Sequence, residues 1–239
     1  VIVILLVYVD GIIITGNCRD ELENVKSFLK SQFLIKDLGE LKYFLGIEVI
    51  RTDQGICLNQ RKYCLELLQE FGMLACKPVK TPLEPNLVIK KECDLDPSDY
   101  VVNITEFQKL IGKLIYLTMT RPDISYVVQI LSQYMHKPYK SHVNIALRLL
   151  RYLKDCPGKG IHITKTDSLS LIGFVDADWA KFLFSRRSVT GYLVYFAGSL
   201  VSWKSKKQST VSRSSTESEY KALGSVTCEI IWICLLYTS

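Results

Sequence analysis

The sequence predicts an α+β protein, with strand-rich parts at both ends of the chain and helices between them. Two β-branched runs within residues 1–15 meet at Asp10-Gly11, which is a strong signal for a tight hairpin. Through much of residues 105–154 the apolar residues repeat at helical spacing. From Ile161 onward the apolar period changes to two, which is typical of strands.

The first part of the chain is predicted to contain two hairpins, each followed by a helix. The first helix begins near an acidic cluster, which suits the positive end of a helix dipole, and the second helix ends at Gly72. The predicted elements are strands at residues 1–9, 12–15, 42–51 and 55–58, and helices from residue 19 or 20 onward and over residues 60–71.

The middle of the chain opens with a predicted exposed connector at residues 76–97, which holds four of the seven prolines. After it, helical and then strand periodicity indicate the remaining elements. These are helices near residues 105–119, 122–135 and 141–154, strands at 161–164, 169–176, 188–196 and 199–204, and a last helix at 214–236.

Length and composition indicate a globular protein with an excess of positive charge. The 239 residues suffice for one large domain or two to three small ones, and 48% hydrophobic content suffices for apolar cores. The net charge is +6, and residues 137–165 hold seven basic side chains against one acidic side chain. This local excess favours an anionic partner.

Cysteine usage and the apolar opening exclude several classes of protein. Eight cysteines without a C-x-x-C pair, and three histidines, predict neither a zinc site nor a disulfide framework. Reduced thiols in an intracellular protein are the simplest account. The opening has no basic segment and carries Asp10, so we expect neither a targeting signal nor a membrane span. Because the chain starts at Val1 within a strand pattern, it looks like an excerpt from a longer protein.

The segment GFVDADW contains the first candidate site. Asp176 and Asp178 are two residues apart on a predicted strand, so both carboxylates project to the same side. Two close carboxylates repel each other, and a bound Mg²⁺ would neutralise them. The alternative is a strand end with ordinary surface acids.

The segment RSSTESEYKAL contains the second candidate. Ser214 and Glu217 have the spacing of a capping box, so Glu217 has a structural role at the start of a helix. Glu219 is rotated by roughly 200° and is expected on the inward side, with Ala222 and Leu223. An inward carboxylate needs a partner or a metal, so Glu219 is the better site candidate. The alternative is a partly exposed helix acid.

Two basic segments are candidates for contact with nucleic acid. Arg148, Arg151 and Lys154 form a stripe on the outer face of the third middle helix, which can follow a phosphate backbone or simply face solvent. The segment WKSKKQSTVSR is read as a basic loop with one aromatic residue. The full set of candidate side chains is Arg148, Arg151, Lys154, Arg186, Arg187, Lys204, Lys206, Lys207 and Arg213.

Seven consecutive segments carry a resemblance to a known family: YVDGIIITG, DLGELKYFLGIEV, LNQRKYCLELLQEFGM, LIGKLIYLTMTRPDISYVV, LRLLRYLKDCPGKGI, GFVDADWA and RRSVTGYLVYFAGSLVSWKSKKQSTVSRSSTESEYKAL. In this order they resemble the Pol polyprotein of copia-type LTR retrotransposons. The first segment is similar to the Tyr-Val-Asp-Asp hairpin of their reverse transcriptases. The resemblance covers essentially the whole chain.

The resemblance implies three parts. Residues 1–80 correspond to the C-terminal part of a reverse-transcriptase palm with a thumb-like segment, and residues 81–165 to a linker and a helical connection region. Residues 166–239 correspond to an RNase H-like mixed α/β domain that is truncated at its C-terminus. The implied partner is an RNA/DNA hybrid or a template-primer duplex, with no membrane. The implied compartment is the cytoplasm, within a virus-like particle, or the nucleus.

The resemblance also implies roles for acidic residues. Asp10 corresponds to a carboxylate of the polymerase metal site, and Asp176 and Glu219 to the first two acids of RNase H. In such enzymes, carboxylates hold two Mg²⁺ ions, or Mn²⁺ in their place, that orient and polarise the reacting phosphate. Asp178 is a further candidate metal ligand. The implied activities are RNA-directed DNA synthesis and cleavage of the RNA strand in hybrids.

Departures from the family pattern predict that these activities are lost. Gly11 stands where the family has a second Asp, and a further polymerase Asp is expected upstream in a segment that this chain lacks. Lys181, Phe182, Leu183 and Phe184 replace an acidic loop. The third RNase H acid and the histidine are expected beyond Ser239. We therefore expect an inactive fragment with weak metal binding, or alternatively a non-catalytic module that binds nucleic acid.

Overall fold

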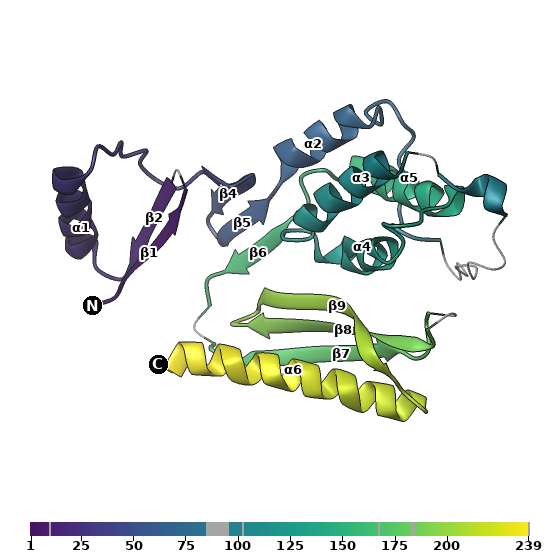
Figure 1. Cartoon of the computed structure of the whole chain (residues 1–239). Helices are drawn as coiled ribbons and strands as arrows, with labels where there is room; N and C mark the ends of the chain where they lie inside the picture. The colour runs from purple at the N-terminus through teal and green to yellow at the C-terminus, as the bar shows by residue number, and fades with distance from the viewer. Residues whose placement is uncertain (10, 85–95, 102, 167, 183–184, 239) are drawn as a thin grey trace. The chain divides into compact units, whose positions relative to one another are not determined.

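The computed structural model describes residues 1–9, 11–84, 96–101, 103–166, 168–182 and 185–238. The fold is mixed α+β, as the sequence predicts, and the chain divides into two compact units, Val1–Val49 and Ile50–Ser239 (Figure 1). Among the described residues, every helix is too short or too polar to cross a lipid bilayer.

The first unit begins with a β-hairpin and a helix. β1 (Val3–Tyr8) pairs antiparallel with β2 (Gly11–Gly16), so the predicted hairpin is confirmed. α1 (Arg19–Gln32) follows, with two acidic residues in its first turn, where the helix dipole stabilises negative charge. In the described part of this unit, no residue is buried.

The prediction of a single strand over residues 42–51 is wrong. The segment contains β3 (Tyr43–Phe44) and β4 (Ile47–Thr52), and their first residues pair antiparallel. Leu45 and Gly46 form the turn between them, with φ values of 48° and 77°. Two successive positive φ angles are the geometry of a type I′ hairpin turn. Leu45 carries no local signal for this conformation, which β-branched and large residues rarely adopt.

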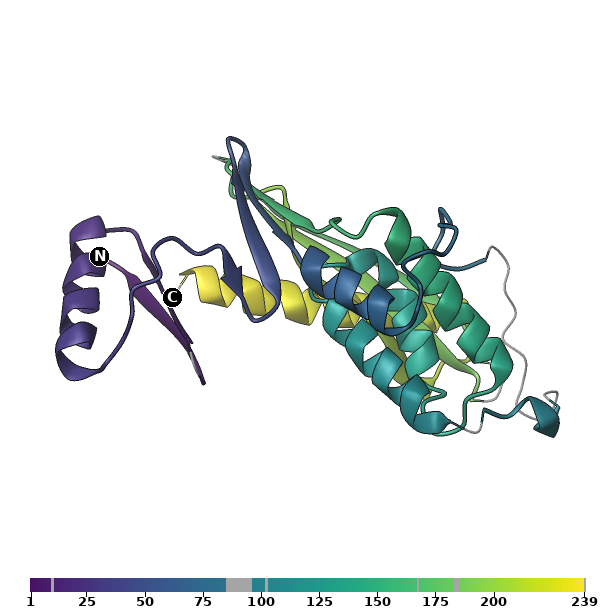
Figure 2. The ribbon, with the colours of Figure 1, turned by 90° about the horizontal axis from the view of Figure 1, so that it is seen from above.

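The second unit contains a helical part with its own apolar core. Its helices are α2 (Arg61–Glu70), α3 (Ile104–Leu117), α4 (Ser125–Ser132) and α5 (Lys140–Asp155), and a 3-10 turn (Pro122–Ile124) precedes α4. All four helices contribute buried residues to one cluster. Figures 1 and 2 show the four helices lying together. α3 and α5 have the strongly one-sided apolar spacing that this packing requires.

A largely buried ion pair just before α4 is linked by hydrogen bonds to the last turns of α5. The Arg121 side chain is 2% exposed and donates to both carboxylate oxygens of Asp123, at 3.0 and 2.9 Å, and to the carbonyl of Cys156 at 2.9 Å. Tyr152 donates to Asp123 at 2.6 Å. Burial alone would raise the pKa of Asp123, but the hydrogen bonds from Arg121 and Tyr152 outweigh it and lower the pKa to about 2.

Strands of the second unit form antiparallel pairs. β5 (Gly55–Asn59) pairs with β6 (Ile161–Thr164), and β6 has the predicted bounds. A separate three-stranded sheet has the order β7 (Leu171–Asp178), β8 (Arg187–Phe196), β9 (Ser199–Val211). β7 begins and ends two residues later than predicted. β9 continues seven residues past the predicted end, so the expected basic loop is a strand.

The last helix, α6 (Ser215–Thr238), covers one face of the β7–β8–β9 sheet (Figure 1). Tyr192 and Val194 of β8 are buried with Val226 of α6. A Cβ added at Gly173 in β7 would lie 2.7 Å from Ile230 Cδ1, so the helix approaches the sheet closely at this glycine. The opposite face of the sheet is contacted by the helical part, where Trp203 Nε1 donates to the Thr118 carbonyl at 3.0 Å.

Candidate functional site

The alternation along β7 places the two candidate aspartates on one face. Gly173 and Val175 face α6, so Phe174, Asp176 and Asp178 project toward the opposite face. The expected shared side for the two carboxylates is therefore observed. Both residues line a pocket of about 320 Å³ between this face and the start of α4.

The two aspartates differ in their partners. Tyr126 of α4 donates its hydroxyl to Asp178 Oδ2 at 2.8 Å, and Lys181 Nζ lies 3.5 Å from the same oxygen. The carboxylate of Asp176 has no such partner within the described part of the chain. Asp176 is thus available to a ligand, whereas Asp178 already joins β7 to the helical part.

Glu219 reaches the same strand from α6. Its Oε1 accepts a hydrogen bond from the backbone amide of Ala177 at 3.3 Å. This contact brings the Glu219 carboxylate to the residue that directly follows Asp176. The Glu219 carboxylate of α6 therefore lies beside the backbone of β7, next to the position of Asp176, whereas the Asp176 side chain projects toward the face of the sheet that points away from α6.

The expectation that Glu219 lies on the inward side of its helix is wrong. Glu219 is exposed, and Leu223 is 48% exposed. The buried positions are Ser218, Ala222 and Val226, which are four residues apart and so share one face of the helix. Glu219 is rotated by one residue from this stripe, at the flank of the helix, and the cost of burying a carboxylate does not arise.

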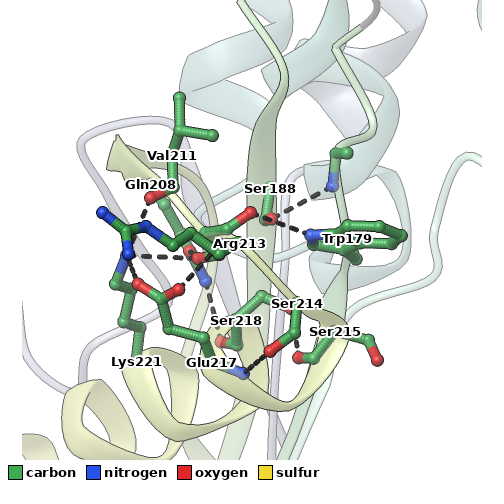
Figure 3. Close-up of polar contacts among 12 residues, drawn as sticks. Trp179, Ser188, Gln208, Val211, Arg213, Ser214, Ser215, Glu217, Ser218 and Lys221 are labelled. Atoms are coloured by element: carbon green, nitrogen blue, oxygen red, sulfur yellow. Dashed lines mark hydrogen bonds and ion pairs between the residues drawn. The ribbon is translucent and has the colours of Figure 1, made fainter.

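Capping contacts fix the start of α6 (Figure 3). Ser214 Oγ accepts from the Glu217 amide at 3.1 Å, as the predicted capping box requires. The reciprocal bond is shifted, because Glu217 Oε2 accepts from the amide of Arg213 at 2.7 Å rather than from that of Ser214. Glu217 also pairs with Lys221 at 2.8 Å. The hydrogen bond from Lys221, followed by that from the Arg213 amide, lowers the pKa of Glu217.

A buried glutamine, which sequence reasoning missed, connects the sheet to this helix start (Figure 3). Gln208 Nε2 donates to Thr190 Oγ1 at 3.1 Å and to the Ser218 carbonyl at 3.0 Å. Ser212 donates its hydroxyl to Gln208 Oε1 at 3.2 Å, and Trp179 Nε1 donates to the Ser212 carbonyl at 3.0 Å. These contacts hold the residues after β7 and the first turn of α6 in a defined register. No local sequence signal identifies Gln208, because its bonds to Thr190 and Ser218 span 18 and 10 residues.

The predicted basic stripe of α5 is engaged by the connector. Arg148 donates to Glu84 at 2.9 Å and to Thr81 at 3.0 Å, and Arg151 Nε donates to the Lys77 carbonyl at 2.8 Å. Lys154 is half-buried. A nucleic acid that used this stripe would therefore displace these intramolecular contacts.

The lysines of β9 are divided between the two faces of the sheet. Lys204 and Lys206 pair in register with Tyr192 and Thr190, on the α6 side. Lys207 projects to the other side, where its Nζ lies 4.4 Å from the centre of the Phe182 ring. Burial, followed by repulsion from Arg187, lowers the pKa of Lys207.

The remaining basic candidates are exposed. Arg186, Arg187 and Arg213 have exposed side chains. Arg186 has a φ of 51° and lies in the loop before β8. Leu183 and Phe184 of that loop lie outside the described residues.

The polymerase candidate Asp10 also lies outside the described residues. Its neighbour Gly11 opens β2 and pairs with Tyr8. A Cβ at position 11 would lie 3.2 Å from Phe44 Cε2. A carboxylate at this position would thus require the Phe44 ring to shift by a few tenths of an ångström.

Asp176 on β7 and Glu219 on α6 carry the type of ligand that a hard divalent cation prefers. Asp176 and Glu219 offer carboxylate oxygens, and Mg²⁺ is commonly bound by one or two carboxylates together with substrate phosphates. Within the described residues, no group of three or more His, Cys, Asp or Glu side chains gathers to hold a metal ion. The described residues therefore offer fewer than three such ligands at any one place.

Comparisons with known proteins point in one direction. Residues 1–85 match the family model for reverse transcriptase (RNA-dependent DNA polymerase). The chain is 45% identical over 237 residues to the retrovirus-related Pol polyprotein from transposon RE1 of Arabidopsis thaliana, and this match covers 99% of this chain and 16% of the polyprotein. It is 35% identical over 236 residues to the corresponding polyprotein from transposon TNT 1-94 of Nicotiana tabacum, with 97% and 18% covered.

A shorter relative matches along most of its length. The chain is 42% identical over 230 residues to the uncharacterized mitochondrial protein AtMg00810 of Arabidopsis thaliana, which covers 95% of this chain and 93% of that protein. No solved structure matches the chain. The chain thus spans less than a fifth of the two Pol polyproteins but nearly all of the mitochondrial protein.

Proposed function

Because this chain belongs to the family of copia-type retrotransposon Pol polyproteins, we propose that it is a reverse-transcriptase-related segment whose residues 166–239 form an RNase H-like domain. The substrate of such a domain is the RNA strand of an RNA/DNA hybrid. On the same relationship, the expected compartments are the cytoplasm, within a virus-like particle, and the nucleus.

One observation carries the RNase H proposal. The Glu219 carboxylate of α6 accepts from the Ala177 amide at 3.3 Å and so lies beside the strand position of Asp176. The capping contacts of Ser214 and the bonds of Gln208 hold the start of α6 at this place. This contact supports the proposal that Asp176 and Glu219, which come from separate elements, would together hold a divalent ion at this edge of the sheet, as metal-assisted phosphoryl transfer requires.

Asp176 and Glu219 are the residues that would hold the divalent ion. When bound, Mg²⁺ or Mn²⁺ would orient and polarise the scissile phosphate. Asp178 contributes in a different way, because its bond to Tyr126 positions the end of β7 against α4. Exposed Arg186, in the loop before β8, and exposed Arg187, the first residue of β8, offer positive charge for a phosphate backbone.

We further propose that the chain has no polymerase activity and little or no nuclease activity. Gly11 supplies no carboxylate at the hairpin, and a single acid there cannot hold two cations. On the RNase H side, two carboxylates bind a cation more weakly than three or four do. Metal binding is therefore expected to be weak and hybrid cleavage slow or absent.

Metal binding and cleavage test this proposal on the full chain. Mn²⁺ binding is followed by paramagnetic relaxation of water protons, and cleavage with a labelled RNA/DNA hybrid in Mg²⁺ or Mn²⁺. We expect weak Mn²⁺ binding that Asp176→Asn and Glu219→Gln each abolish and that the exposed control Asp20→Asn leaves unchanged. Any residual cleavage is expected to disappear in Asp176→Asn. Mn²⁺ binding that survives both site variants contradicts the proposal, and salt-sensitive hybrid binding without metal binding indicates a non-catalytic module.

A further inference from the structure

The last helix, α6, carries large apolar side chains that are exposed. Those with an exposed fraction between 48% and 70% are Tyr220, Leu223, Ile231, Trp232, Leu235 and Leu236. The buried stripe of Ser218, Ala222 and Val226 faces the sheet, which lies along one side of the helix (Figure 1). Because contiguous apolar patches on a protein surface often mark a site of association, the exposed side of α6 is a candidate interface.

The second half of α6 carries very little charge. From Ala222 to Leu236 the sequence has one charged side chain, Glu229, and its carboxylate accepts the Ser202 hydroxyl at 2.7 Å. Exposed helix faces normally carry charged and polar residues. A nucleic acid would find no positive charge on this surface, whereas a second copy of the same surface would bring no like charges together.

The outer face of α6, opposite its buried stripe, consists of Tyr220, Gly224, Thr227, Ile231 and Leu235. These residues are three or four positions apart and so share one face of the helix, and all five are exposed. Gly224 and Ile231 lie equally far from a point just after Thr227. Tyr220 and Leu235 also lie equally far from this point. The positions of the outer face are therefore arranged symmetrically along the helix.

An antiparallel second copy centred on this point would place large residues opposite small ones. Gly224 of one copy would face Ile231 of the other copy. A Cβ added at Gly224 would meet no atom within 4 Å, so the glycine leaves room that an isoleucine side chain can occupy. Large and small residues at facing positions allow two helices to interdigitate. The contact occurs twice, so the outer face is complementary to itself, as a two-fold dimer requires.

The exposed apolar area suffices for a weak dimer. Full burial removes on the order of 100 Å² for a large aliphatic side chain and ~200 Å² for an aromatic one. The six exposed side chains of α6 therefore offer ~500 Å² per copy, since each is about half exposed. Two copies would bury ~1,000 Å² in total, which is the lower limit for a specific interface.

We propose that the outer face of α6 binds the same face of a second copy of this chain, with the two helices antiparallel. Burial of apolar surface drives the association, and no residue of the outer face is charged. The Kd is therefore expected in the micromolar range and should change little between low and moderate NaCl concentrations. The proposal goes beyond the RNase H assignment and does not depend on a bound metal ion.

Sedimentation velocity of the full chain in reducing buffer, over a concentration series, tests the proposal. We expect a monomer–dimer equilibrium. Ile231→Lys places a charge opposite Gly224 of the second copy and is expected to raise the Kd at least tenfold. The control Phe28→Lys makes the same kind of change at a 63% exposed position of α1 and is expected to leave the Kd unchanged. A monomer at every concentration, or a dimer that Ile231→Lys leaves intact, overturns the proposal.

A second variant separates loss of the dimer from loss of the fold. Gly224→Leu fills the room for Ile231 of the second copy but meets no neighbour within its own chain. Leucine also favours a helix more than glycine does, so the thermal unfolding midpoint should stay the same or rise. We expect the Kd to rise at least tenfold nevertheless. An unchanged Kd in folded Gly224→Leu overturns the assignment of the interface.

Two exposed cysteines of α6 test the antiparallel arrangement. A helix rises ~1.5 Å per residue, so the two Cys228 residues of the dimer would be offset along the helices by only ~2 Å, and the two Cys234 residues by ~20 Å. A reagent that links thiols over a few ångströms should therefore crosslink wild type and Cys234→Ser, and fail to crosslink Cys228→Ser. A crosslinked dimer that is retained in Cys228→Ser and lost in Cys234→Ser overturns the antiparallel arrangement.

Discussion

The two compact units use similar apolar side chains, but one of them encloses those side chains and the other does not. In the helical part of the second unit, residues such as Leu114, Leu149 and Leu150 have an exposed fraction of 0%. In the first unit Leu6 is 55% exposed and Val7 is 66% exposed. A two-stranded hairpin with one helix has too few layers to cover an apolar face. This difference in burial indicates that the second unit contributes most of the free energy of unfolding of this chain.

Loss of the ion pair between Arg121 and Asp123 is expected to change the free energy of unfolding more than any other substitution considered below. Asp123→Asn leaves the Arg121 guanidinium, which is 2% exposed, without its carboxylate. We expect the free energy of unfolding of the second unit to fall by about 3–5 kcal/mol. Urea unfolding followed by far-UV circular dichroism measures this change.

The matched control lies in the first unit. Asp37 pairs with Lys26 at 3.6 Å on the surface, and Asp37→Asn is expected to leave the urea midpoint unchanged, because solvent screens exposed pairs. If Asp123→Asn and Asp37→Asn shift the urea midpoint equally, the two units do not differ in their contribution to the free energy of unfolding.

A leucine pair tests the same comparison with apolar residues. Leu149→Ala opens a cavity in the helical core and is expected to lower the free energy of unfolding by about 2–5 kcal/mol. Leu6→Ala in β1 is expected to change it by less than about 0.5 kcal/mol, since that side chain is already half exposed. Equal losses in the two variants would show that β1 is buried in solution.

The sequence predicts elements well where the signal is local. The Asp10-Gly11 turn predicts the first hairpin, and the change to a period of two predicts β6 with its observed bounds. The turn at Leu45 is missed because a leucine at positive φ has no local sequence signal. The lysines of β9 lie on two faces of the sheet because side chains alternate along a strand. The sequence predicts a loop in this segment, so this alternation could not be predicted from it.

The candidate site was predictable in part. The resemblance singles out Asp176 and Glu219, whereas the hydrogen bond between Glu219 and the Ala177 amide is a tertiary contact that periodicity alone does not give. The contacts of the connector with Arg148 and Arg151, and the bond from Arg121 to the Cys156 carbonyl, also join residues far apart in sequence. The spacing of apolar and charged residues predicts which residues share a face of one helix or strand. It does not predict which other element packs on that face.

The buried His142 predicts that the stability of the second unit depends on pH. His142 is 1% exposed, accepts the Tyr139 amide at Nδ1 and stacks on Tyr134 with ring centres 3.9 Å apart. Burial lowers the pKa of His142 to about 4, whereas an unfolded histidine has a pKa of ~6.5. The unfolded state therefore takes up a proton first as the pH falls.

The sign of the His142 effect follows from this order of protonation. Its contribution to stability is complete above pH ~6.5 and is lost as the pH falls toward 4, a loss of about 3 kcal/mol in all. Urea unfolding between pH 7 and 4 measures it, and His142→Gln is expected to flatten the profile over this window. An equally steep profile in the variant would assign the pH dependence to other groups.

The smallest expected effect compares the two helix starts directly. Ser214 Oγ caps α6 by accepting from the Glu217 amide at 3.1 Å, whereas Cys18 precedes α1 and makes no side-chain cap. Ser214→Ala is expected to lower the free energy of unfolding by about 1 kcal/mol, and Cys18→Ala to leave it unchanged. In hydrogen exchange, the first turn of α6 should lose protection in Ser214→Ala while α5 keeps its own. Because this turn also holds Glu219 beside Ala177, Mn²⁺ binding should weaken together with the protection. Protection lost without any change in Mn²⁺ binding would separate the cap from the position of the candidate metal ligand.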